Sequence, residues 1–584
     1  MRRKGNASHC QQKQRSFCSA LFHDYSLIFA FILFFIPSIG SISIDKSENA
    51  NGKGRYKVYQ IRPNSEAQLI ELNRMEQQGT IDFWRPPPSV NSSGDVMVDV
   101  LRNGRHFLDF LRKFQVEFKV LVDDLSKLIE EKEIGPSPYA KLSKNGPILR
   151  DTFDRFEGFG LRMGDYHSFA DLLAFMQNVQ NAMPSRAQLR TIGWTAEGRP
   201  LQGIQFGNPS DKSRPVVWID AGIHAREWTA VHTAAYFIFY FANQIRLGQD
   251  QRLLKCLERV DILVLPCLNP DGYEFTRSEP RNPAVRMWRK NRSKERCATS
   301  ARDGQTHCCK GVDLNRNFDF KFANGGTSFF PCSEVFHGEN AFSELETRAV
   351  RDAILGTDLR GRVPAMITMH AYSQLWIYPF SHRRGVYPAD VEELKAVARR
   401  AVTALAEKFG TNYQYGTGPE TIYAYTGGSA DWAKETAKVK YTYTLELRPS
   451  YWSVSAWNGF VLDRAQLIPT ARETFDGVLV VMEQVVREMA EQTVPNPNAA
   501  VPFVRRSISS APLSADRPQS SLSADDVNSR HGSVVSSRVL PNRIGSPCED
   551  SLPYCAVWVA SNERICIDSK ATMERECRKS CQFC

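Results

Sequence analysis

A chain of 584 residues is longer than a single hydrophobic core supports, so it contains more than one domain. Its apolar fraction of 42% is that of a globular protein. The net charge of +10 is small for this length and is spread along the chain, which argues against nucleic-acid binding.

The N-terminus has the pattern of a secretory signal. Basic residues at 2–4 precede an apolar run at 27–36, and a proline and small residues follow it. We expect a signal peptide at residues 1–43 and a secreted protein. Ten apolar residues are too few to span a bilayer comfortably. A signal anchor, with its apolar core extended to Ile44, is the alternative, because the basic region is unusually long.

The cysteines favour an oxidising compartment. Two of the 14 fall in the expected signal, and the remaining twelve form an even set that suits disulfides. They form two groups, which are Cys256, Cys267, Cys297, Cys308, Cys309 and Cys332, and Cys548, Cys555, Cys566, Cys577, Cys581 and Cys584.

Residues 55–134 have the pattern of a small α+β domain. Apolar residues alternate as in strands at 56–61, 96–101 and 118–122, and have helical spacing at 66–78 and 106–114. A polar stretch at 135–163 follows, with prolines, glycines and basic residues. It suits a connector that an activating protease can reach.

Residues 164–491 alternate apolar strands with helices in the α/β manner. The clearest strands are at 216–220, 260–265, 364–369 and 441–447, and a helix is expected at 228–241. Residues 492–547 are rich in Ser, Pro, Arg and Asp, which predicts a disordered linker. The last segment, 548–584, holds six cysteines and is too small to fold without such staples.

One histidine-containing motif suits a metal. His224 and Glu227 stand in His-Ala-Arg-Glu, directly after the strand at 216–220, and His370 ends another strand. Two imidazoles and one carboxylate suit a catalytic zinc with one position left open for water. The motif alone also fits an exposed polar turn. Its place at a strand's carboxyl end, where open α/β sheets bind ligands, favours the metal.

Three further positions could serve hydrolysis of a peptide bond. Glu446 lies in an apolar strand, as a general base or as the partner of an arginine in a structural ion pair. Arg289 could stabilise an oxyanion or simply lie on the surface. Asn315 and Arg316 could bind a carboxylate or cap a helix or turn.

Eight motifs together, in this order, resemble the zinc metallocarboxypeptidases of the pancreatic carboxypeptidase A/B type. They are His224-x-x-Glu227, Asn-Pro-Asp-Gly-Tyr at 269–273, Trp-Arg-Lys at 288–290, Gly-Val-Asp-Leu-Asn-Arg-Asn at 311–317, His-Ala-Tyr-Ser-Gln at 370–374, Thr-Ile-Tyr at 421–423, Gly-Gly-Ser-Ala-Asp-Trp at 427–432 and Leu-Glu-Leu-Arg at 445–448. Residues 55–134, with Ile-Asp-Phe-Trp at 81–84, resemble the family's activation pro-domain.

The resemblance implies the fold and a role for each site residue. The fold is α/β, a mixed central sheet flanked by helices (catalytic domain, 164–491), preceded by the small α+β pro-domain and followed by the disordered linker and the disulfide-rich module. The implied activity is release of the last residue from peptide or protein C-termini by a zymogen. One Zn²⁺ ion would be bound by His224, Glu227 and His370, with Glu446 as the general base and Arg289 as the partner of the oxyanion. The terminal carboxylate of the substrate would be bound by Asn315, Arg316 and Tyr423. The neighbouring subsites would be lined by Arg226 and Tyr372.

The resemblance also bears on specificity. Relatives that prefer basic C-terminal residues carry Asp at the position of Ala430, and those that prefer apolar or aromatic residues usually carry Ile. Ala430 is uncharged, so a basic side chain would be buried unpaired. We expect a preference for apolar or aromatic residues, with a roomier pocket floor than Ile leaves. Ser381 and Thr444, also pocket positions by resemblance, add only mild polarity.

By resemblance, Cys309 pairs with Cys332. The simplest remaining pairs are Cys256–Cys267 and Cys297–Cys308, among fifteen connectivities that six cysteines allow. The last forty residues resemble the ShK-toxin-like module common in secreted nematode proteins. That resemblance implies the pairs Cys548–Cys584, Cys555–Cys577 and Cys566–Cys581. The module could block a potassium channel or dock on extracellular matrix, cuticle or substrate. We favour docking, because residues 548–584 lack the Lys-Tyr pair of the blockers.

Two alternatives stay open for the whole chain. One is a catalytically silent binding protein on the same fold. The other, which is compatible with an active enzyme, is a matrix component organised by the C-terminal module. Asn91 and Asn291 each begin an N-glycosylation sequon. A glycan on Asn291 could obstruct a site built around Arg289.

Overall fold

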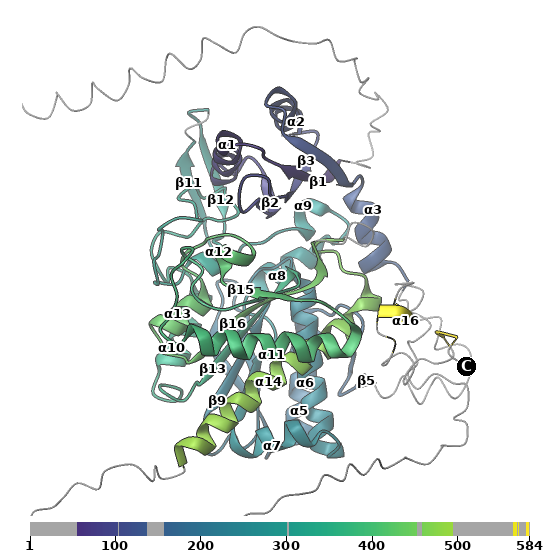
Figure 1. The fold of residues 1–584 in the computed structure, drawn as a ribbon, viewed down its shortest axis with the longest axis vertical. Coiled ribbons are helices and arrows are strands. Elements are labelled where there is room, and N and C mark those ends of the chain that lie inside the picture. The colour runs from purple at the N-terminus through teal and green to yellow at the C-terminus, as the bar shows by residue number, and fades with distance from the viewer. Residues whose placement is uncertain are drawn as a thin grey trace, which may run out of the picture. The chain divides into compact units, whose positions relative to one another are not determined.

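The computed structural model describes residues 55–102, 104–136, 157–300, 303–451, 458–493, 565–568, 570 and 580–582. The expected signal, most of the connector and linker, and Cys548, Cys555, Cys577 and Cys584 lie outside these residues. No helix within them is long and apolar enough to cross a lipid bilayer. They form a small N-terminal domain and a large domain that follows it in the chain (Figure 1).

The N-terminal domain is a four-stranded antiparallel sheet with two helices, in strand order β2-β3-β1-β4. Its elements are β1 (Tyr56–Arg62), α1 (Glu66–Gln77), β2 (Asp82–Arg85), β3 (Gly94–Asp99), α2 (Gly104–Lys113) and β4 (Glu117–Val122). Helix α1 begins after Ser65, whose side chain accepts the N–H of Gln68. A short helix α3 (Leu125–Ile129) and a wider turn η1 (Glu130–Ile134) lead out of the domain.

Strand β1 alternates its side chains between two cores. Tyr59 and Ile61 join a cluster with Phe107 and Leu111, which lie one turn apart on α2. Val58 points the other way, into the same apolar cluster as the core of the large domain. The N-terminal domain therefore has its own core and also packs against the large domain.

The large domain is built on an eight-stranded mixed sheet, in strand order β15-β14-β16-β13-β9-β10-β8-β7. The strands are β7 (Ala187–Trp194), β8 (Pro200–Phe206), β9 (Val216–Ala221), β10 (Asp261–Leu265), β13 (Ala365–Ser373), β14 (Leu375–Ile377), β15 (Gln414–Gly416) and β16 (Tyr441–Ser450). Strands β10, β9, β13 and β16 are mutually parallel, so their carboxyl ends lie at one edge of the sheet.

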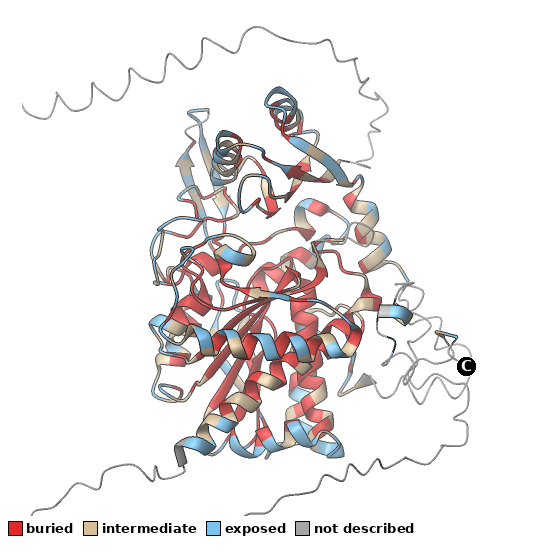
Figure 2. Ribbon diagram, in the orientation of Figure 1, coloured by how far each residue is buried: buried red, intermediate tan, exposed pale blue. Residues whose placement is uncertain are grey.

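Helices cover both faces of this sheet, as the buried strands in Figure 2 show. One apolar cluster joins one face to α5 (Phe169–Ala182), α6 (Trp228–Leu247), α7 (Gln251–Arg259), α11 (Val391–Phe409) and α14 (Leu467–Thr493). A second joins the other face to α10 (Leu345–Leu355) and α13 (Ser429–Glu435). Strand β9 serves both, because Val217 and Ile219 belong to the first cluster and Val216 and Trp218 to the second.

Shorter elements complete the described residues. They are β5 (Glu157–Gly158), β6 (Leu161–Arg162), α8 (Pro270–Ser278), α9 (Pro283–Arg286), β11 (Glu295–Thr299), β12 (Thr306–Lys310), η3 (Leu314–Arg316), α12 (Gly418–Thr421), η4 (Arg464–Gln466) and α16 (Ile565–Asp568).

The disulfides agree with the expected pairs in part. Cys309 is joined to Cys332, Cys297 to Cys308 across the β11–β12 hairpin, and Cys566 to Cys581 in the C-terminal module. The expected pair Cys256–Cys267 is wrong, because both thiols are free and buried. Cys256 lies on α7, before β10, and Cys267 follows the far end of that strand. Five strand residues span about 16 Å, whereas bridged Cα atoms lie within about 7 Å.

The sequon at Asn291 is also not a glycan site in this fold. Asn291 is 1% exposed, and its amide donates to Glu344 at 2.9 Å and to Glu346 at 3.1 Å. A side chain held this way cannot carry a sugar without disrupting the fold. Asn91 is exposed and remains a candidate.

Candidate active site

Three expected ligands meet at the carboxyl edge of the large sheet. His224 and Glu227 lie in the loop between β9 and α6, where Glu227 directly precedes the helix, and His370 lies on β13. Nδ1 of His370 is 3.1 Å from Nδ1 of His224 and 3.0 Å from Oε2 of Glu227. Nδ1 of His224 is 2.7 Å from Oε1 of Glu227. All three side chains are buried.

This donor set fits a zinc ion. Zinc binds imidazole nitrogen and carboxylate oxygen at about 2.0–2.2 Å, which places tetrahedral ligand atoms about 3.3 Å apart. The observed spacing is close to that value. Two imidazole nitrogens that face each other at 3.1 Å can share only one proton, so a cation between them satisfies both.

Asp313, which the sequence did not single out, orients one ligand. Its Oδ1 lies 3.1 Å from Nε2 of His224, and its Oδ2 accepts from Nη2 of Arg289 at 2.9 Å. Although burial alone raises the pKa of Asp313, Arg289 and Arg316 hold it well below its usual range. Asp313 is therefore a permanent carboxylate that fixes both a ligand and a cation of the site.

Glu446 stands beside the three ligands. It pairs in register with His370 across the parallel strands β13 and β16, and it lines the same cavity. Burial raises the pKa of this carboxyl to about 8, against the opposing effect of His370. Within the described part of the chain, Glu446 has no arginine partner, because the nearby Arg448 donates to Glu473 at 2.7 Å. The ion-pair alternative for Glu446 therefore finds no support.

Two arginines and a tyrosine also line the cavity. Arg289 is 7% and Arg316 is 1% exposed, and Nη2 of Arg316 lies 3.3 Å from the hydroxyl of Tyr423. The amide oxygen of Asn315 accepts the N–H of Ser429 at 2.9 Å, which holds Asn315 in place. The site thus joins a metal-binding group, a carboxylate and two cations in one cavity.

Two expected pocket residues, Ala430 and Ser381, do not line this cavity. Ala430 is buried, at 6% exposure, but the cavity is bounded instead by Tyr425, together with Ile377, Ile422 and Thr444. Tyr425 was missed because it stands between two of the motifs, two residues after Tyr423. The feature of the sequence that could have revealed Tyr425 is a bulky aromatic residue shortly before two glycines.

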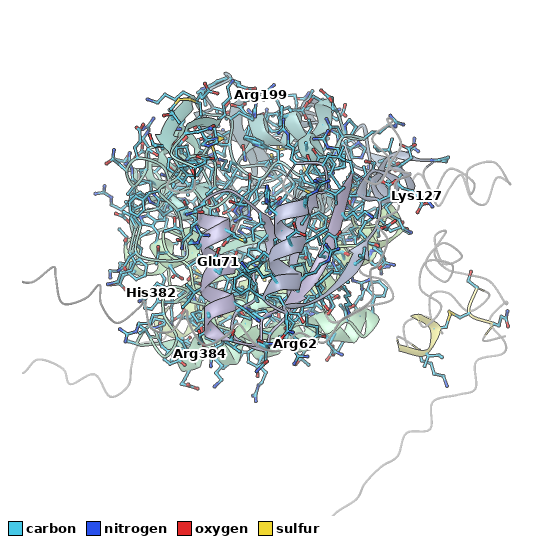
Figure 3. All side chains as sticks on the ribbon, turned by 90° about the horizontal axis from the view of Figure 1, so that it is seen from above. Arg62, Glu71, Lys127, Arg199, His382 and Arg384 are labelled. Atoms are coloured by element: carbon cyan, nitrogen blue, oxygen red, sulfur yellow. A yellow bond between two sulfur atoms is a disulfide. The ribbon has the colours of Figure 1, made fainter. Side chains whose placement is uncertain are left out.

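The N-terminal domain covers the site. Arg226 donates to Asp82 at 2.8 Å and to the carbonyl of Phe83 at 3.2 Å, and the hydroxyl of Tyr372 donates to Asp95 at 2.8 Å. Both expected subsite residues, Arg226 and Tyr372, are thus engaged by this domain. Figure 3 looks onto the domain from above.

Two further contacts extend the cover. The indole of Trp84 lines the cavity and lies 5.0 Å, between ring centroids, from Phe460. Farther along, Arg286 forms an ion pair with Glu133 at 2.6 Å, and neither side chain is exposed. The domain therefore blocks access to the metal-binding group.

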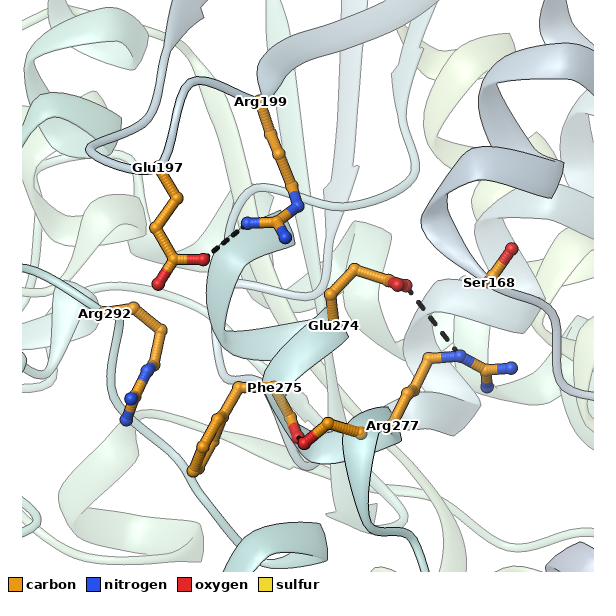
Figure 4. Close-up of a pocket in the computed structure, with 8 residues that line it drawn as sticks. Ser168, Glu197, Arg199, Glu274, Phe275, Arg277 and Arg292 are labelled. Carbon is orange, nitrogen blue, oxygen red and sulfur yellow. Dashed lines mark hydrogen bonds and ion pairs between the residues drawn. The ribbon is translucent and has the colours of Figure 1, made fainter.

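A larger surface pocket of about 500 Å³ contains none of these residues (Figure 4). Its charges largely pair with one another, since Arg199 donates to Glu197 at 2.6 Å and Arg277 lies 3.8 Å from Glu274. We therefore place the chemistry at the smaller, buried cavity.

Comparison with known proteins agrees with this geometry. Family models match for "Zinc carboxypeptidase" at residues 172–477, "Carboxypeptidase activation peptide" at 59–132 and "ShK domain-like" at 547–584. The chain is 33% identical over 436 residues to carboxypeptidase A1 of Bos taurus, covering 74% of this chain and 94% of the relative. It is 31% identical over 445 residues to zinc carboxypeptidase A 1 of Anopheles gambiae, covering 76% and 92%.

Solved structures show the same fold. Carboxypeptidase A from Helicoverpa armigera superposes with a TM-score of 0.61 at 26% identity, covering 75% of this chain and 99% of that one. Thrombin-activatable fibrinolysis inhibitor superposes with a TM-score of 0.60 at 27% identity, covering 74% and 99%. The chain therefore belongs to the zinc carboxypeptidase family, and it is a metallocarboxypeptidase made with an activation peptide and an ShK-like domain.

Proposed function

We propose that this enzyme is a secreted zymogen that removes apolar residues one at a time from peptide C-termini. One observation carries the proposal. The group His224, Glu227 and His370 shares a single buried cavity with Glu446, which has no arginine partner within the described residues, and with the cations Arg289 and Arg316. In this proposal the first three residues hold the zinc ion.

The carboxylate of the substrate's last residue is held by Arg316 and Asn315, and the Tyr423 hydroxyl beside Arg316 closes over it. This clamp explains why only a chain end is cut. An internal peptide bond offers no carboxylate at a fixed position next to the metal-binding group, so it cannot form this ion pair with Arg316.

Bound zinc supplies a Lewis acid that polarises the scissile carbonyl and acidifies water. Glu446 accepts a proton from the attacking water and passes it to the nitrogen of the departing amino acid. Arg289 donates to the oxygen that becomes negative as the water adds, and Asp313 keeps the guanidinium aimed at it. A zinc ion held by His224, Glu227 and His370 would favour the ionised form of the neighbouring Glu446, which is the form that acts as a base.

Among the side chains that line the cavity, the uncharged Ile377, Ile422, Thr444 and Tyr425 support a preference for apolar C-terminal residues over basic ones. No acidic side chain other than Glu227 and Glu446 lines the cavity. A lysine or arginine side chain would enter without a counter-charge and would lose its hydration.

Activation requires a cut between residues 135 and 163, by a protease of the extracellular space. The activation-peptide and catalytic matches, which leave residues 133–171 between them, support this position. The signal-like N-terminus and the disulfides support secretion. The last part of the proposal is that the enzyme docks on extracellular matrix or cuticle through residues 548–584.

The test uses trypsin-treated, zinc-loaded protein and matched peptides that end in Phe, Leu, Lys, Glu or amidated Phe, with and without a zinc chelator. We expect chelator-sensitive release of apolar residues and none from the amide. Release of Lys at a comparable rate would contradict the specificity. No release from any peptide by correctly folded protein would favour the silent binding protein.

A further inference from the structure

We propose that Tyr425 closes the pocket that receives the side chain of the substrate's last residue. The enzyme then accepts small and branched aliphatic residues and discriminates against aromatic ones. This inference rests on the proposed carboxypeptidase function and narrows its substrate class.

The ring of Tyr425 stands beside the carboxylate clamp. Cζ of Arg316 lies 4.7 Å from the centroid of this ring, and the ring of Tyr423 is 6.0 Å away. Once the terminal carboxylate is bound by Arg316, the side chain on the adjacent Cα atom must project within a few ångströms of the clamp. Tyr425 therefore lies where that side chain has to go.

The ring is not free to swing aside. Its residue is 7% exposed, and its hydroxyl lies within hydrogen-bonding reach of the Ser381 side chain, itself 2% exposed. On one side, a Cβ atom placed on Gly428 would come within 2.7 Å of Cε2 of Tyr425. Behind the backbone, a Cβ atom on Gly326 would lie 2.7 Å from Cα of Tyr425. Ring and backbone are thus packed against glycines that admit nothing larger.

The small side chain of Ala430 and the large side chain of Tyr425 both bear on the length of the pocket. Gly428 caps α13, and Ala430 follows two residues later on the same helix. Tyr425 borders the cavity whereas Ala430 does not. The space left by the small side chain of Ala430 is therefore not open to the substrate. The pocket is shorter than the sequence alone suggested.

The remaining space is small, and uncharged side chains border it next to Tyr425. With the activation peptide in place, the cavity measures about 30 Å³, which is room for one or two water molecules. Ile377, Ile422 and Thr444 line it next to Tyr425, so that branched aliphatic groups find matching surfaces. An aromatic ring has to displace Tyr425 from its packed position. Such overpacking lowers kcat/KM about tenfold to a hundredfold.

The test compares two substrates on one enzyme preparation. Activated wild-type, Tyr425→Ala and Tyr425→Phe enzymes are given matched peptides that end in Val or Phe, and the ratio of their kcat/KM values is measured. The ratio does not depend on the fraction of enzyme that folds correctly. Tyr387→Ala, at a tyrosine that is 43% exposed and outside the cavity, is the matched control.

We expect wild-type enzyme, Tyr425→Phe and Tyr387→Ala to favour Val at least tenfold, and Tyr425→Ala to lose or reverse that preference. The inference is overturned if wild-type enzyme releases Phe as fast as Val, or if Tyr425→Ala keeps the wild-type ratio. In both of these outcomes the carboxypeptidase function stands. Release of neither residue overturns that function and this inference together.

Discussion

Replacing Asp82 by asparagine is expected to activate the zymogen without any cut in the chain. Asp82 accepts two hydrogen bonds from Nη1 of Arg226, at 2.8 and 3.0 Å. The side chain of Arg226 is 1% exposed and that of Asp82 is 16% exposed, so the pair is largely shielded from water. The substitution leaves the size of the side chain nearly unchanged and removes its charge.

The magnitude follows from the burial of the pair. Removing one partner of a buried ion pair costs about 3–5 kcal/mol. Arg226 keeps its bond to the carbonyl of Phe83 and its position 4.4 Å from the ring of Phe460, so the low end applies. A loss of about 3 kcal/mol raises the population with the activation peptide undocked roughly 150-fold.

The assay measures release of a C-terminal apolar residue by intact zymogen, relative to the same preparation after full activation. Electrophoresis verifies that the chain is uncut. Asp123→Asn is the matched control, because Asp123 pairs with Lys57 at the surface, is 79% exposed and contributes little to docking. The reasoning is refuted if the Asp82→Asn zymogen is no more active than the Asp123→Asn zymogen.

Three further outcomes are expected. Glu446→Gln lowers kcat by about 10²- to 10⁴-fold while the affinity for the separated activation peptide is retained, and an unchanged kcat would exclude Glu446 as the base. Glu76 lies on helix α1 of the activation peptide and is near enough to Arg316 of the large domain for their charges to interact. Burial raises the pKa of Glu76 to about 7, against the opposing effect of Arg316. Docking of the activation peptide is therefore strongest below about pH 4.5 and weakens as pH rises through 7. The dissociation constant of the peptide, measured from pH 4.5 to 8, is expected to rise over this range, by up to about 3 kcal/mol of binding free energy. Glu76→Gln is expected to remove this pH dependence. Mass spectrometry of protein from secreting cells finds no glycan on Asn291, and a glycan there would contradict its burial.

The sequence predicted what depends on local pattern and on strand ends. The apolar runs of β9, β13 and β16 were legible because strands buried on both faces admit few polar residues. His224, His370 and Glu446 stood out because they interrupt or end those runs. Their meeting at one edge follows from the parallel direction of the strands.

What the sequence did not predict depends on packing between distant segments. Nearest-neighbour pairing failed for Cys256 and Cys267 because a strand separates them. A sequon is a local tripeptide and says nothing about the burial of Asn291. The position of Tyr425 at the pocket depends on Gly326, which lies on a distant segment, as well as on the nearby Gly428. Asp82 meets Arg226 only because one domain docks on another, which no local pattern encodes.

The shared apolar cluster between the two domains has a kinetic consequence. Val58, Trp84 and Leu125 of the activation peptide remain packed on the large domain after the connector is cut, because cutting breaks none of these contacts. The cut only turns an intramolecular contact, held at an effective concentration on the order of millimolar, into a bimolecular one. Cleavage and activity are therefore separate events. A concentrated, fully cut preparation stays silent, and catalysis emerges when the mixture is diluted or when the freed peptide is itself degraded.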